Sequence, residues 1–375
     1  MDNNHLLTLS AALVTNTPLL LWGPPGVGKT ATIQAVARHL DLPLEVVIAS
    51  IREPSDFAGL PIVTGEAKTR GVTLAPPAWA VRLAEAGRGI LFLDEITTAP
   101  PAVQAALLRV VLDRVAGDLD LPAGVTIVAA ANPPEQAAGG WELTPPLANR
   151  FAHLDWPQPW ATHWSEALIT GWPAPNLPTI PDDWQAKLPL ARGLVSGFIQ
   201  SRPSLLHALP SDPAQQGRAW PSPRTWEMAT KMLAAGLSVT EDEGALTSLV
   251  ASCVGQAVAL EFMALVGGDM LPNPEEMLKH PETVELPTRP DKLMMALQAV
   301  VAAVIDNVTP ERWDAAWTIM ARAAKEQAVD VAASAARSLS TLWAEHYNRP
   351  GMPALEMPED KIEPFVAVLR AALKY

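Results

Sequence analysis

The chain carries the sequence Gly23-Pro24-Pro25-Gly26-Val27-Gly28-Lys29-Thr30 directly after the apolar run Leu19-Leu20-Leu21-Trp22. This order fits the Walker A pattern GxxxxGK[ST], in which a strand feeds a glycine-rich turn and a helix follows. In such a turn, backbone N–H groups face the phosphates, Lys29 brings a cation to the β- and γ-phosphates, and Thr30 offers Mg²⁺ a hydroxyl. The helix adds the positive end of its dipole. The stretch therefore predicts a nucleoside triphosphate site, in preference to a chance glycine-rich turn.

A second motif, Ile90-Leu91-Phe92-Leu93-Asp94-Glu95, is an unbroken apolar run that ends in two acids. The run is typical of a central parallel strand covered by helices on both faces. It fits Walker B, in which Asp94 would hold Mg²⁺ directly or through water and Glu95 would orient or deprotonate the attacking water. Helix capping is the alternative for the acidic pair. Because both motifs end strands, where open α/β sheets bind ligands, the sequence favours the nucleotide interpretation.

Two further strand ends carry polar residues. Asn132 follows the apolar run Val125 to Ala131, and Arg150 precedes the expected strand His153 to Trp156. Taken alone, an asparagine before Pro133 is an ordinary turn residue. An arginine at a helix end is usually solvated, so neither residue predicts a function by itself.

The order of these features along the chain resembles that of the AAA+ ATPases, and specifically the MoxR-like branch, whose second helix carries an insert. The resemblance covers about residues 5 to 260 and is more specific for the superfamily than for the branch. The segments that carry it are GPPGVGKT (23 to 30), ILFLDEI (90 to 96), Pro100-Pro101 at the start of the next helix, AAANPPEQ (129 to 136), LANRF (147 to 151) and Ser222-Pro223-Arg224.

The resemblance implies roles for three of the polar residues. Asn132 would be sensor 1, Arg150 the arginine finger, and Arg224 the sensor 2 arginine on a helical lid. A solvated arginine at a helix start is a comparable interpretation of Arg224, and the lid of the insert-bearing group leaves open whether Arg224 serves its own site or a neighbouring one. Lys29, Thr30 and Asp94 would hold Mg-ATP, while Arg150 of an adjacent protomer would complete the site.

The same resemblance implies an ATP hydrolase that assembles as a ring, expected to be a homo-hexamer, and remodels or matures another protein. A von Willebrand factor A domain protein is the first expected partner. The alternatives are the motor subunit of a metal chelatase or carboxylase activase, and a nucleotide-gated scaffold or DNA-associated module with little turnover. ATP is preferred to GTP on the resemblance, since no guanine-reading NKxD motif is evident.

The insert is predicted to be a β-hairpin, because the β-prone runs 61–64 and 71–74 flank a polar tip from Gly65 to Arg70. Relatives project such a hairpin toward the pore of a ring, where Lys68 or Arg70 could touch a partner. An idle surface hairpin is an equal alternative. Residues 116–124 could form a second, fainter hairpin.

Composition bears on the expected partners, on the single cysteine and on the expected location of the protein. A formal charge of −13 disfavours nucleic acid and anionic membranes as partners. The single cysteine, Cys253, cannot form an internal disulfide, and Leu246, Leu249, Ala257 and Leu260 are expected to share its helical face, so it is predicted to be a core residue. The seven histidines form no metal-ligand spacing. The N-terminus lacks the basic start of a secretory signal and no apolar stretch is long enough to cross a bilayer, so a cytoplasmic location is expected.

The predicted fold class is α/β: a P-loop AAA+ core with a parallel sheet flanked by helices, followed by a helical lid and a helical C-terminal extension. The expected segments are the core (1–156), a connector rich in proline and tryptophan that packs against it (157–187), the lid (188–270) and the extension (271–375). Trp226, Met228, Met232 and Leu233 are expected in the core of the lid. Asn273-Pro274 and Thr309-Pro310 predict helix starts in the extension, and Leu293 to Ile305 and Trp313 to Trp343 are expected to be long helices.

Overall fold

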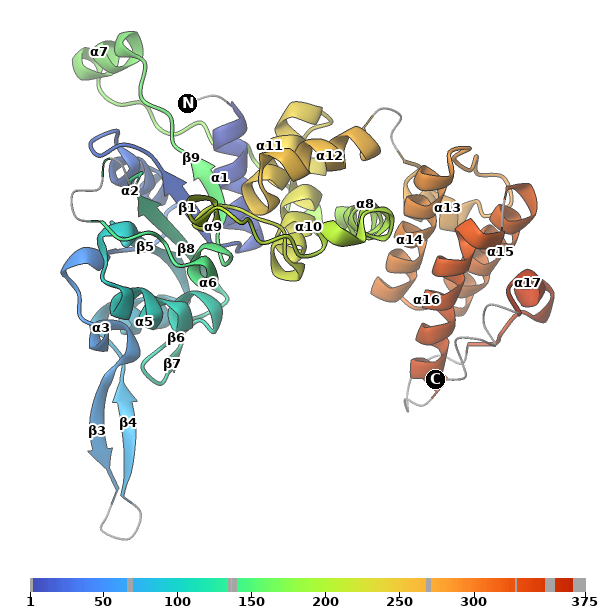
Figure 1. The fold of residues 1–375 in the computed structure, drawn as a ribbon, viewed down its shortest axis with the longest axis horizontal. Coiled ribbons are helices and arrows are strands. Elements are labelled where there is room, and N and C mark those ends of the chain that lie inside the picture. The colour runs from blue at the N-terminus through green and yellow to red at the C-terminus, as the bar shows by residue number, and fades with distance from the viewer. Residues whose placement is uncertain are drawn as a thin grey trace. The chain divides into compact units, whose positions relative to one another are not determined.

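The computed structural model describes residues 3–65, 70–133, 136, 140–267, 271–327, 329–347 and 355–366. The chain divides into two compact units (Figure 1). Unit 1 comprises Met1–Pro181 and His207–Ala259, and unit 2 comprises Asp182–Leu206 and Leu260–Tyr375.

Unit 1 is built on a parallel five-stranded sheet with the order β2-β5-β8-β1-β9. Its strands are β1 (Leu19–Trp22), β2 (Leu44–Ile48), β5 (Arg88–Asp94), β8 (Gly124–Ala131) and β9 (Ala152–Asp155). In the register, Trp22 lies opposite both Ala131 and Asp155, and Ile48 lies opposite Asp94. The carboxyl ends of all five strands therefore lie at one edge of the sheet, and the loops that leave that edge can share one site.

Helices flank this sheet, as the sequence predicts for an α/β core. They are α1 (Asn3–Thr15), α2 (Lys29–His39), α4 (Ala78–Ala86) and α5 (Pro101–Leu112), with the single turns α3 (Ser55–Ala58) and α6 (Pro145–Ala148). Strands β1, β5 and β8 are buried almost throughout, because helices cover both faces. The predicted fold class is confirmed.

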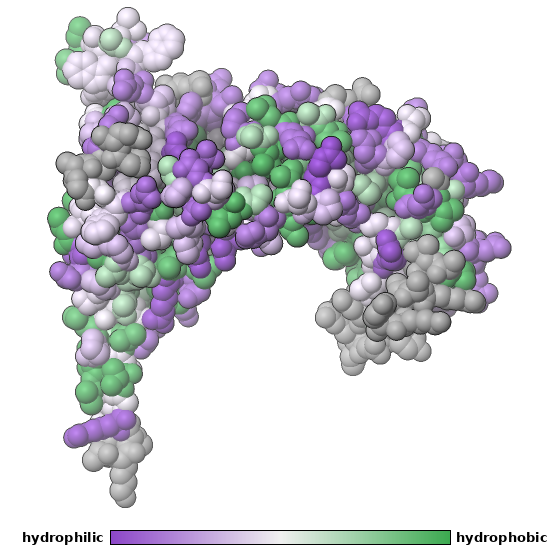
Figure 2. Space-filling view, viewed as in Figure 1, coloured by the Kyte–Doolittle hydropathy of each residue, from purple (hydrophilic) through white to green (hydrophobic). Residues whose placement is uncertain are grey.

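Two antiparallel hairpins lie outside the five-stranded sheet. Strands β3 (Leu60–Thr64) and β4 (Gly71–Ala75) pair antiparallel and project from the rest of unit 1 (Figure 1 and Figure 2). They form the hairpin expected from the insert; Arg70 is exposed, whereas Lys68 lies outside the described residues. The short strands β6 (Val115–Ala116) and β7 (Leu119–Asp120) form the second hairpin.

The helical part of unit 1 contains α9 (Pro213–Gln216), α10 (Pro223–Leu237) and α11 (Glu243–Val254). Ser222 and Thr225 form a capping box at the start of α10. The four expected core residues are all buried: Trp226, Met228, Met232 and Leu233.

Cys253 is buried, and burial raises the pKa of its thiol to about 12. Leu246 and Leu249 lie in the same core, but the expected continuation of this face to Ala257 and Leu260 is wrong. The helix stops at Gly255, whose φ of +87° is left-handed, and α12 (Gln256–Val266) starts in a new direction that leaves Leu260 exposed.

Three tryptophans of the connector do not pack against the core, contrary to expectation, whereas Trp184 near its end is buried. Helix α7 (Ala161–Thr170) buries only Ala167, and Trp160, Trp164 and Trp172 are 72%, 45% and 65% exposed. These rings find neighbours within the connector instead: Trp164 meets Trp172 edge-on at 6.3 Å between centroids, and Trp160 stacks on His163 at 6.0 Å.

Unit 2 is helical. Its main helices are α8 (Leu188–Ser201), α13 (Pro274–Lys279), α14 (Pro290–Asp306), α15 (Pro310–Glu326), α16 (Val329–Tyr347) and α17 (Glu359–Ile362). The helix expected across 313–343 is two helices, because the backbone leaves the helical region at Gln327 (φ −129°, ψ −82°). Among the described residues, no helix combines the length and apolar character that a membrane crossing requires.

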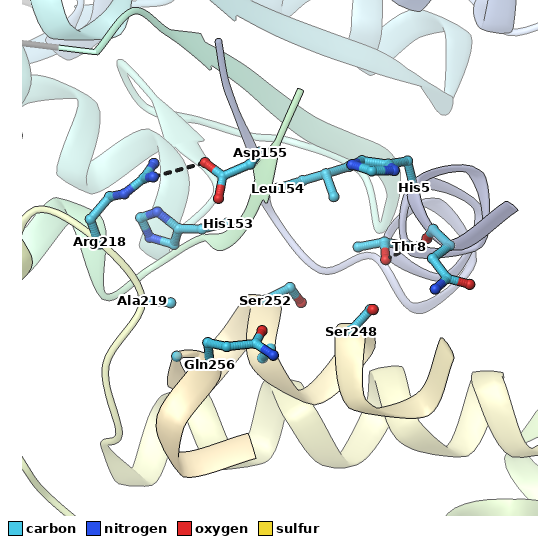
Figure 3. Close-up of a pocket in the computed structure, with 13 residues that line it drawn as sticks. His5, Thr8, His153, Leu154, Asp155, Arg218, Ala219, Ser248, Ser252 and Gln256 are labelled. Carbon is cyan, nitrogen blue, oxygen red and sulfur yellow. Dashed lines mark hydrogen bonds and ion pairs between the residues drawn. The ribbon is translucent and has the colours of Figure 1, made fainter. Parts of the chain in front are cut away.

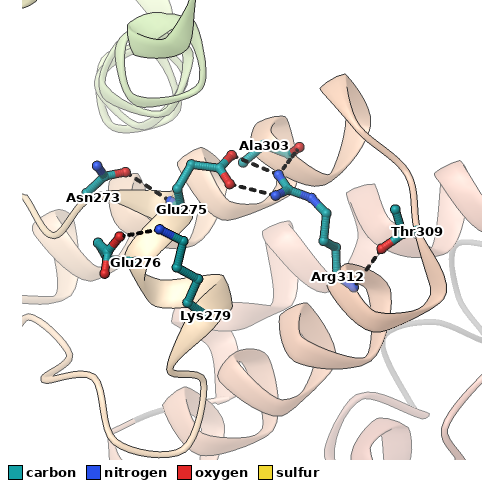
Figure 4. Close-up of polar contacts among 7 residues, drawn as sticks. All are labelled: Asn273, Glu275, Glu276, Lys279, Ala303, Thr309 and Arg312. Carbon is teal, nitrogen blue, oxygen red and sulfur yellow. Dashed lines mark hydrogen bonds and ion pairs between the residues drawn. The ribbon is translucent and has the colours of Figure 1, made fainter.

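Both predicted caps are present in unit 2. The side chain of Asn273 accepts from the N–H of Glu275, and that of Thr309 accepts from the N–H of Arg312 (Figure 4). The Arg312 guanidinium donates to both carboxylate oxygens of Glu275, at 2.6 and 2.8 Å, and to the carbonyl of Ala303 at 2.7 Å. This hydrogen bonding lowers the pKa of the Glu275 carboxyl. One arginine thus ties together the starts of α13 and α15 and the end of α14.

Helices α8 and α14 touch at two glycines. A Cβ built on Gly193 would lie 2.6 Å from the carbonyl oxygen of Met295 and from the Cβ of Ala299, and one on Gly197 would lie 2.4 Å from Cγ of Met295. The helices can approach this closely only because both positions lack a side chain.

We expect Gly193→Ala to destabilise unit 2 by about 1–3 kcal/mol, because the added methyl group forces the two backbones apart. Calorimetric unfolding of the whole chain measures the effect. Gly244→Ala in α11 is the matched control, since its Cβ would meet only the flexible side chain of Asp242. Equal melting of the two variants would show that α8 and α14 can separate at no cost.

Candidate functional site

The loop between β1 and α2 is held by left-handed glycines. Gly26 and Gly28 have φ values of +79° and +90°, and a Cβ on either would meet no atom within 4 Å. Backbone conformation, rather than space, therefore requires glycine at these two positions. Gly23 differs: its Cβ would lie 3.0 Å from the carbonyl oxygen of Trp156, so the start of the loop packs against the end of β9.

Lys29 lies inside this loop. Its side chain is buried, and its Nζ donates to the carbonyl of Gly23 at 2.6 Å, to that of Pro24 at 3.0 Å, and to Oδ1 of Asn132 at 3.0 Å. Burial lowers the pKa of the ammonium, and the negative charge of Asp94 partly opposes this. The predicted loop lysine and the predicted sensor asparagine are thus in direct contact.

Thr30 and Asp94 form the second contact of the site. The Thr30 hydroxyl donates to Oδ2 of Asp94 at 2.7 Å, and Oδ1 of Asp94 accepts from the N–H of Glu95 at 2.9 Å. A hydroxyl and a carboxylate at this spacing are hard oxygen donors, which suit Mg²⁺. These two residues could hold the ion. The described part of the chain contains no group of three or more His, Cys, Asp or Glu side chains placed to bind a metal.

Glu95 adopts a left-handed backbone conformation (φ 56°, ψ 40°), which is uncommon for a residue with a side chain. Its Oε2 accepts a 2.6 Å hydrogen bond from the hydroxyl of Ser50. Sequence analysis missed Ser50, which lies two residues beyond the end of β2. Since β2 pairs with β5 and Ile48 lies opposite Asp94, the parallel register alone would have placed Ser50 near Glu95.

Thr97 is a second residue that sequence analysis missed. It accepts from the N–H of Asn132 at 3.2 Å and its hydroxyl donates to the carbonyl of Asn132 at 3.3 Å. The segment after β5 therefore fixes the backbone at the end of β8, and with it the position of the Asn132 side chain.

Arg150 and Arg224 lie together in a different group. Arg224 donates to Oδ1 of Asn149 at 3.3 Å, and the Arg150 guanidinium donates to the carbonyl of Pro146. Burial lowers the pKa of Arg150, and the nearby charge of Arg224 lowers it further. Two like charges close together can attract an anion. Their hydrogen bonds connect them with Pro146 in α6 and with Asn149 rather than with Lys29.

Asn149 organises this second group. It is buried, its Nδ2 donates to the carbonyl of Trp220 at 3.3 Å, and its Oδ1 accepts from the hydroxyl of Ser222 at 2.8 Å. The residue before Arg150 is thereby tied to the start of α10, which carries Arg224.

A cavity of about 360 Å³ lies beside β9, between the start of α1 and the end of α11 (Figure 3). Arg218 spans one wall: it pairs with Asp155 at 2.8 Å and lies 4.5 Å from the centroid of the Trp22 ring. Trp22 directly precedes Gly23, so Arg218 connects this wall of the cavity with the residue before the glycine-rich loop. The remaining lining residues include His5, Thr8, Ser248, Ser252 and Gln256.

His153, on another wall of the cavity, is held neutral. Nε1 of Trp22 donates to its Nδ1 at 2.8 Å, so its Nε2 carries the proton and lies 2.9 Å from the carbonyl oxygen of Ala148. Burial lowers the pKa of His153 to about 4.

Comparison with known proteins bears on the first part of the chain. Residues 18–151 match the family model "AAA domain (dynein-related subfamily)". The chain is 29% identical over 140 residues to the "Pathogenicity locus probable regulatory protein WtsA" of Pantoea stewartii subsp. stewartii, a match that covers 34% of this chain and 42% of that curated relative. A crystal structure titled "putative ATPase" from Cytophaga hutchinsonii is similar with a TM-score of 0.39 and 17% identity, covering 67% of this chain and 80% of the other. The matched residues contain the glycine-rich loop, Asp94, Glu95, Asn132 and Arg150, and the family match supports an AAA domain in this part of the chain.

Proposed function

We propose that this chain is a Mg²⁺-dependent ATPase of the MoxR-like AAA+ type, which forms a ring and uses ATP hydrolysis to remodel or mature a partner protein. One observation carries the nucleotide part of the proposal. Lys29, Thr30, Asp94 and Asn132 converge at the carboxyl ends of β1, β5 and β8, through hydrogen bonds of 2.7 and 3.0 Å.

Each residue of this group would have a separate task. The Lys29 ammonium would bind the β- and γ-phosphates, Thr30 and Asp94 would hold Mg²⁺, and Asn132 would contact the γ-phosphate. When bound, Mg²⁺ would neutralise charge that develops on the phosphate oxygens. Glu95 would accept a proton from the attacking water.

The ring is proposed from the placement of Arg150. Its group is built around Asn149 and is separate from the Lys29 group of the same chain, so a neighbouring copy is the natural acceptor of its charge. The partner is proposed on family resemblance, with a von Willebrand factor A domain protein as the first expectation. Mass spectrometry of proteins that co-purify with the tagged chain tests that part.

The nucleotide part is tested by calorimetric titration with MgATP and by steady-state phosphate release. We expect Lys29→Ala to weaken MgATP binding roughly tenfold to a hundredfold, since a hydrogen-bonded charge contributes about 1.5–3 kcal/mol. Lys231→Ala, which removes a half-buried lysine paired with Glu227 in the same unit, is the matched control. MgATP affinity that is unchanged in Lys29→Ala would refute the proposed site, and parallel titration with GTP tests the preference for ATP.

A further inference from the structure

Asp118, in the second hairpin, is hydrogen-bonded to the base of the projecting β3–β4 hairpin. The N–H of Leu74 donates to Oδ2 of Asp118 at 2.7 Å, and the N–H of Asp118 donates to the carbonyl of Leu74 at 2.9 Å. Asp118 therefore pairs with both backbone groups of Leu74. It lies in the turn between β6 and β7, 44 residues away in the chain.

The backbones at this contact meet without intervening side chains. Gly117 is left-handed, with φ +62°, and a Cβ on it would lie 2.7 Å from the carbonyl oxygen of Leu74. Gly59, with φ +87°, faces it, and its Cβ would lie 2.7 Å from Cα of Gly117. The N–H of Gly117 also donates to the carbonyl of Phe57 at 3.2 Å. Glycine is required on both sides, so the turn is fitted to the hairpin base.

The β6–β7 hairpin is connected with the start of β8 by hydrogen bonds of Arg114, the residue before β6. Arg114, which is left-handed with φ 58°, donates through its guanidinium to the carbonyls of Pro122, at 2.7 Å, and Val125. Its own carbonyl accepts from the N–H of Leu121 at 2.7 Å. From Val125, β8 continues through the buried sheet and leads into Asn132, which contacts Lys29.

A second connection reaches the same hairpin base from the other side. Phe57 is in α3, which follows the short 3-10 turn containing Ser50, and Ser50 donates to Glu95. The Gly117–Asp118 turn thus contacts both the segment from Ser50 to Phe57, which is hydrogen-bonded to Glu95, and the hairpin that follows this segment. These contacts give a shift of either Asn132 or Glu95 a route to the base of the hairpin.

We propose that Asp118 is a positioning residue that ties the β3–β4 hairpin to the strand bearing Asn132, so that the hairpin base responds to nucleotide. The proposal rests on the proposed function, because it needs nucleotide at the Lys29 site. Asp118 does not touch that site. It acts by holding the N–H of Leu74, so that movement at the amino end of β8 is passed to β4.

Hydrogen exchange of the full chain, followed by mass spectrometry of peptides that cover 60–65 and 71–76, tests this in a Glu95→Gln background with and without MgATP. We expect exchange at the hairpin base to change with MgATP. Asp118→Ala should speed exchange of the Leu74 amide roughly tenfold, the effect of losing a hydrogen bond of about 1.4 kcal/mol, and should abolish the nucleotide-dependent difference. Asp118→Asn, which keeps a side-chain oxygen acceptor, should restore that difference.

Asp120→Ala, which removes an exposed carboxylate from the same small hairpin, is the matched control and should behave like the parent. A merely structural Asp118 would alter exchange without nucleotide but leave the MgATP-dependent difference in place, and that result would overturn the proposal. So would an unresponsive hairpin base in a parent protein that binds MgATP. Failure of the parent to bind MgATP in the calorimeter would instead refute the proposed function, and the positioning role with it.

Discussion

Replacing Glu95 with Gln is expected to leave MgATP binding intact and to slow phosphate release by about 10²- to 10⁴-fold, the usual contribution of a positioned general base. Glutamine has nearly the same shape as glutamate and can still accept the hydrogen bond from Ser50, so the strained backbone at residue 95 should persist. Only the capacity to take a proton is lost. Calorimetric titration with MgATP and single-turnover hydrolysis measure the two expectations separately.

Ser50→Ala is the matched control for this experiment. It removes the 2.6 Å hydrogen bond to Oε2 of Glu95 but leaves the carboxylate in place, so hydrolysis should stay within a few-fold of the parent rate. If Glu95→Gln hydrolyses ATP at the parent rate, Glu95 is not the base. If both variants lose hydrolysis equally, the reaction requires the hydrogen bond from Ser50 as well as the proton acceptor.

The sheet could be predicted from the sequence because three of its strands carry two signals. Leu19 to Trp22, Ile90 to Asp94 and Val125 to Ala131 are apolar runs typical of a parallel strand covered on both faces, and the functional residues of the motifs lie at or just after their ends. The helical regions were less predictable at their breaks. Apolar periodicity continues across Gly255 and Gln327, whereas the backbone at each position leaves the helix.

The exposed tryptophans of the connector show a different limit of sequence analysis. A run rich in tryptophan is usually buried, because aromatic rings carry a large apolar area. In α7, however, the only buried side chain is Ala167, and Trp160 and Trp172 remain more than half exposed. Whether a ring faces the core depends on the direction in which the segment leaves β9, which composition does not specify.

Some residues of the candidate site could be predicted from the sequence and others could not. The motif residues Lys29, Thr30 and Asp94 were predictable, since their types and spacing are dictated by phosphate and Mg²⁺ chemistry. Ser50, Thr97 and Asp118 were not, because serine, threonine and aspartate in loops have no distinctive pattern. Their contacts depend on strand register and on a hairpin turn, which are three-dimensional features.

Arg150→Ala is expected to reduce hydrolysis by about 10³- to 10⁵-fold while MgATP binding survives, if its charge completes the site of a neighbouring copy. Its hydrogen bond to Pro146 lies outside the Lys29 group, so the local fold of the nucleotide site should tolerate the change. Binding and phosphate release are measured as for Glu95→Gln. Arg38→Ala, which removes an exposed arginine of α2, is the matched control.

Mixing two inactive variants distinguishes an arginine that acts in the site of a neighbouring subunit from one that acts within its own chain. Lys29→Ala protein lacks a working site but keeps Arg150, whereas Arg150→Ala protein keeps the site, so in a mixed ring about one interface in four should be complete and hydrolysis should reappear. The same mixture with Arg224→Ala in place of Arg150→Ala decides the role of Arg224. Recovery in that mixture places Arg224 in the neighbour's site, and no recovery places it in its own. If mixtures containing Arg150→Ala recover nothing although the subunits exchange, Arg150 does not act across an interface, and the separate basic group around Asn149 serves some purpose other than hydrolysis.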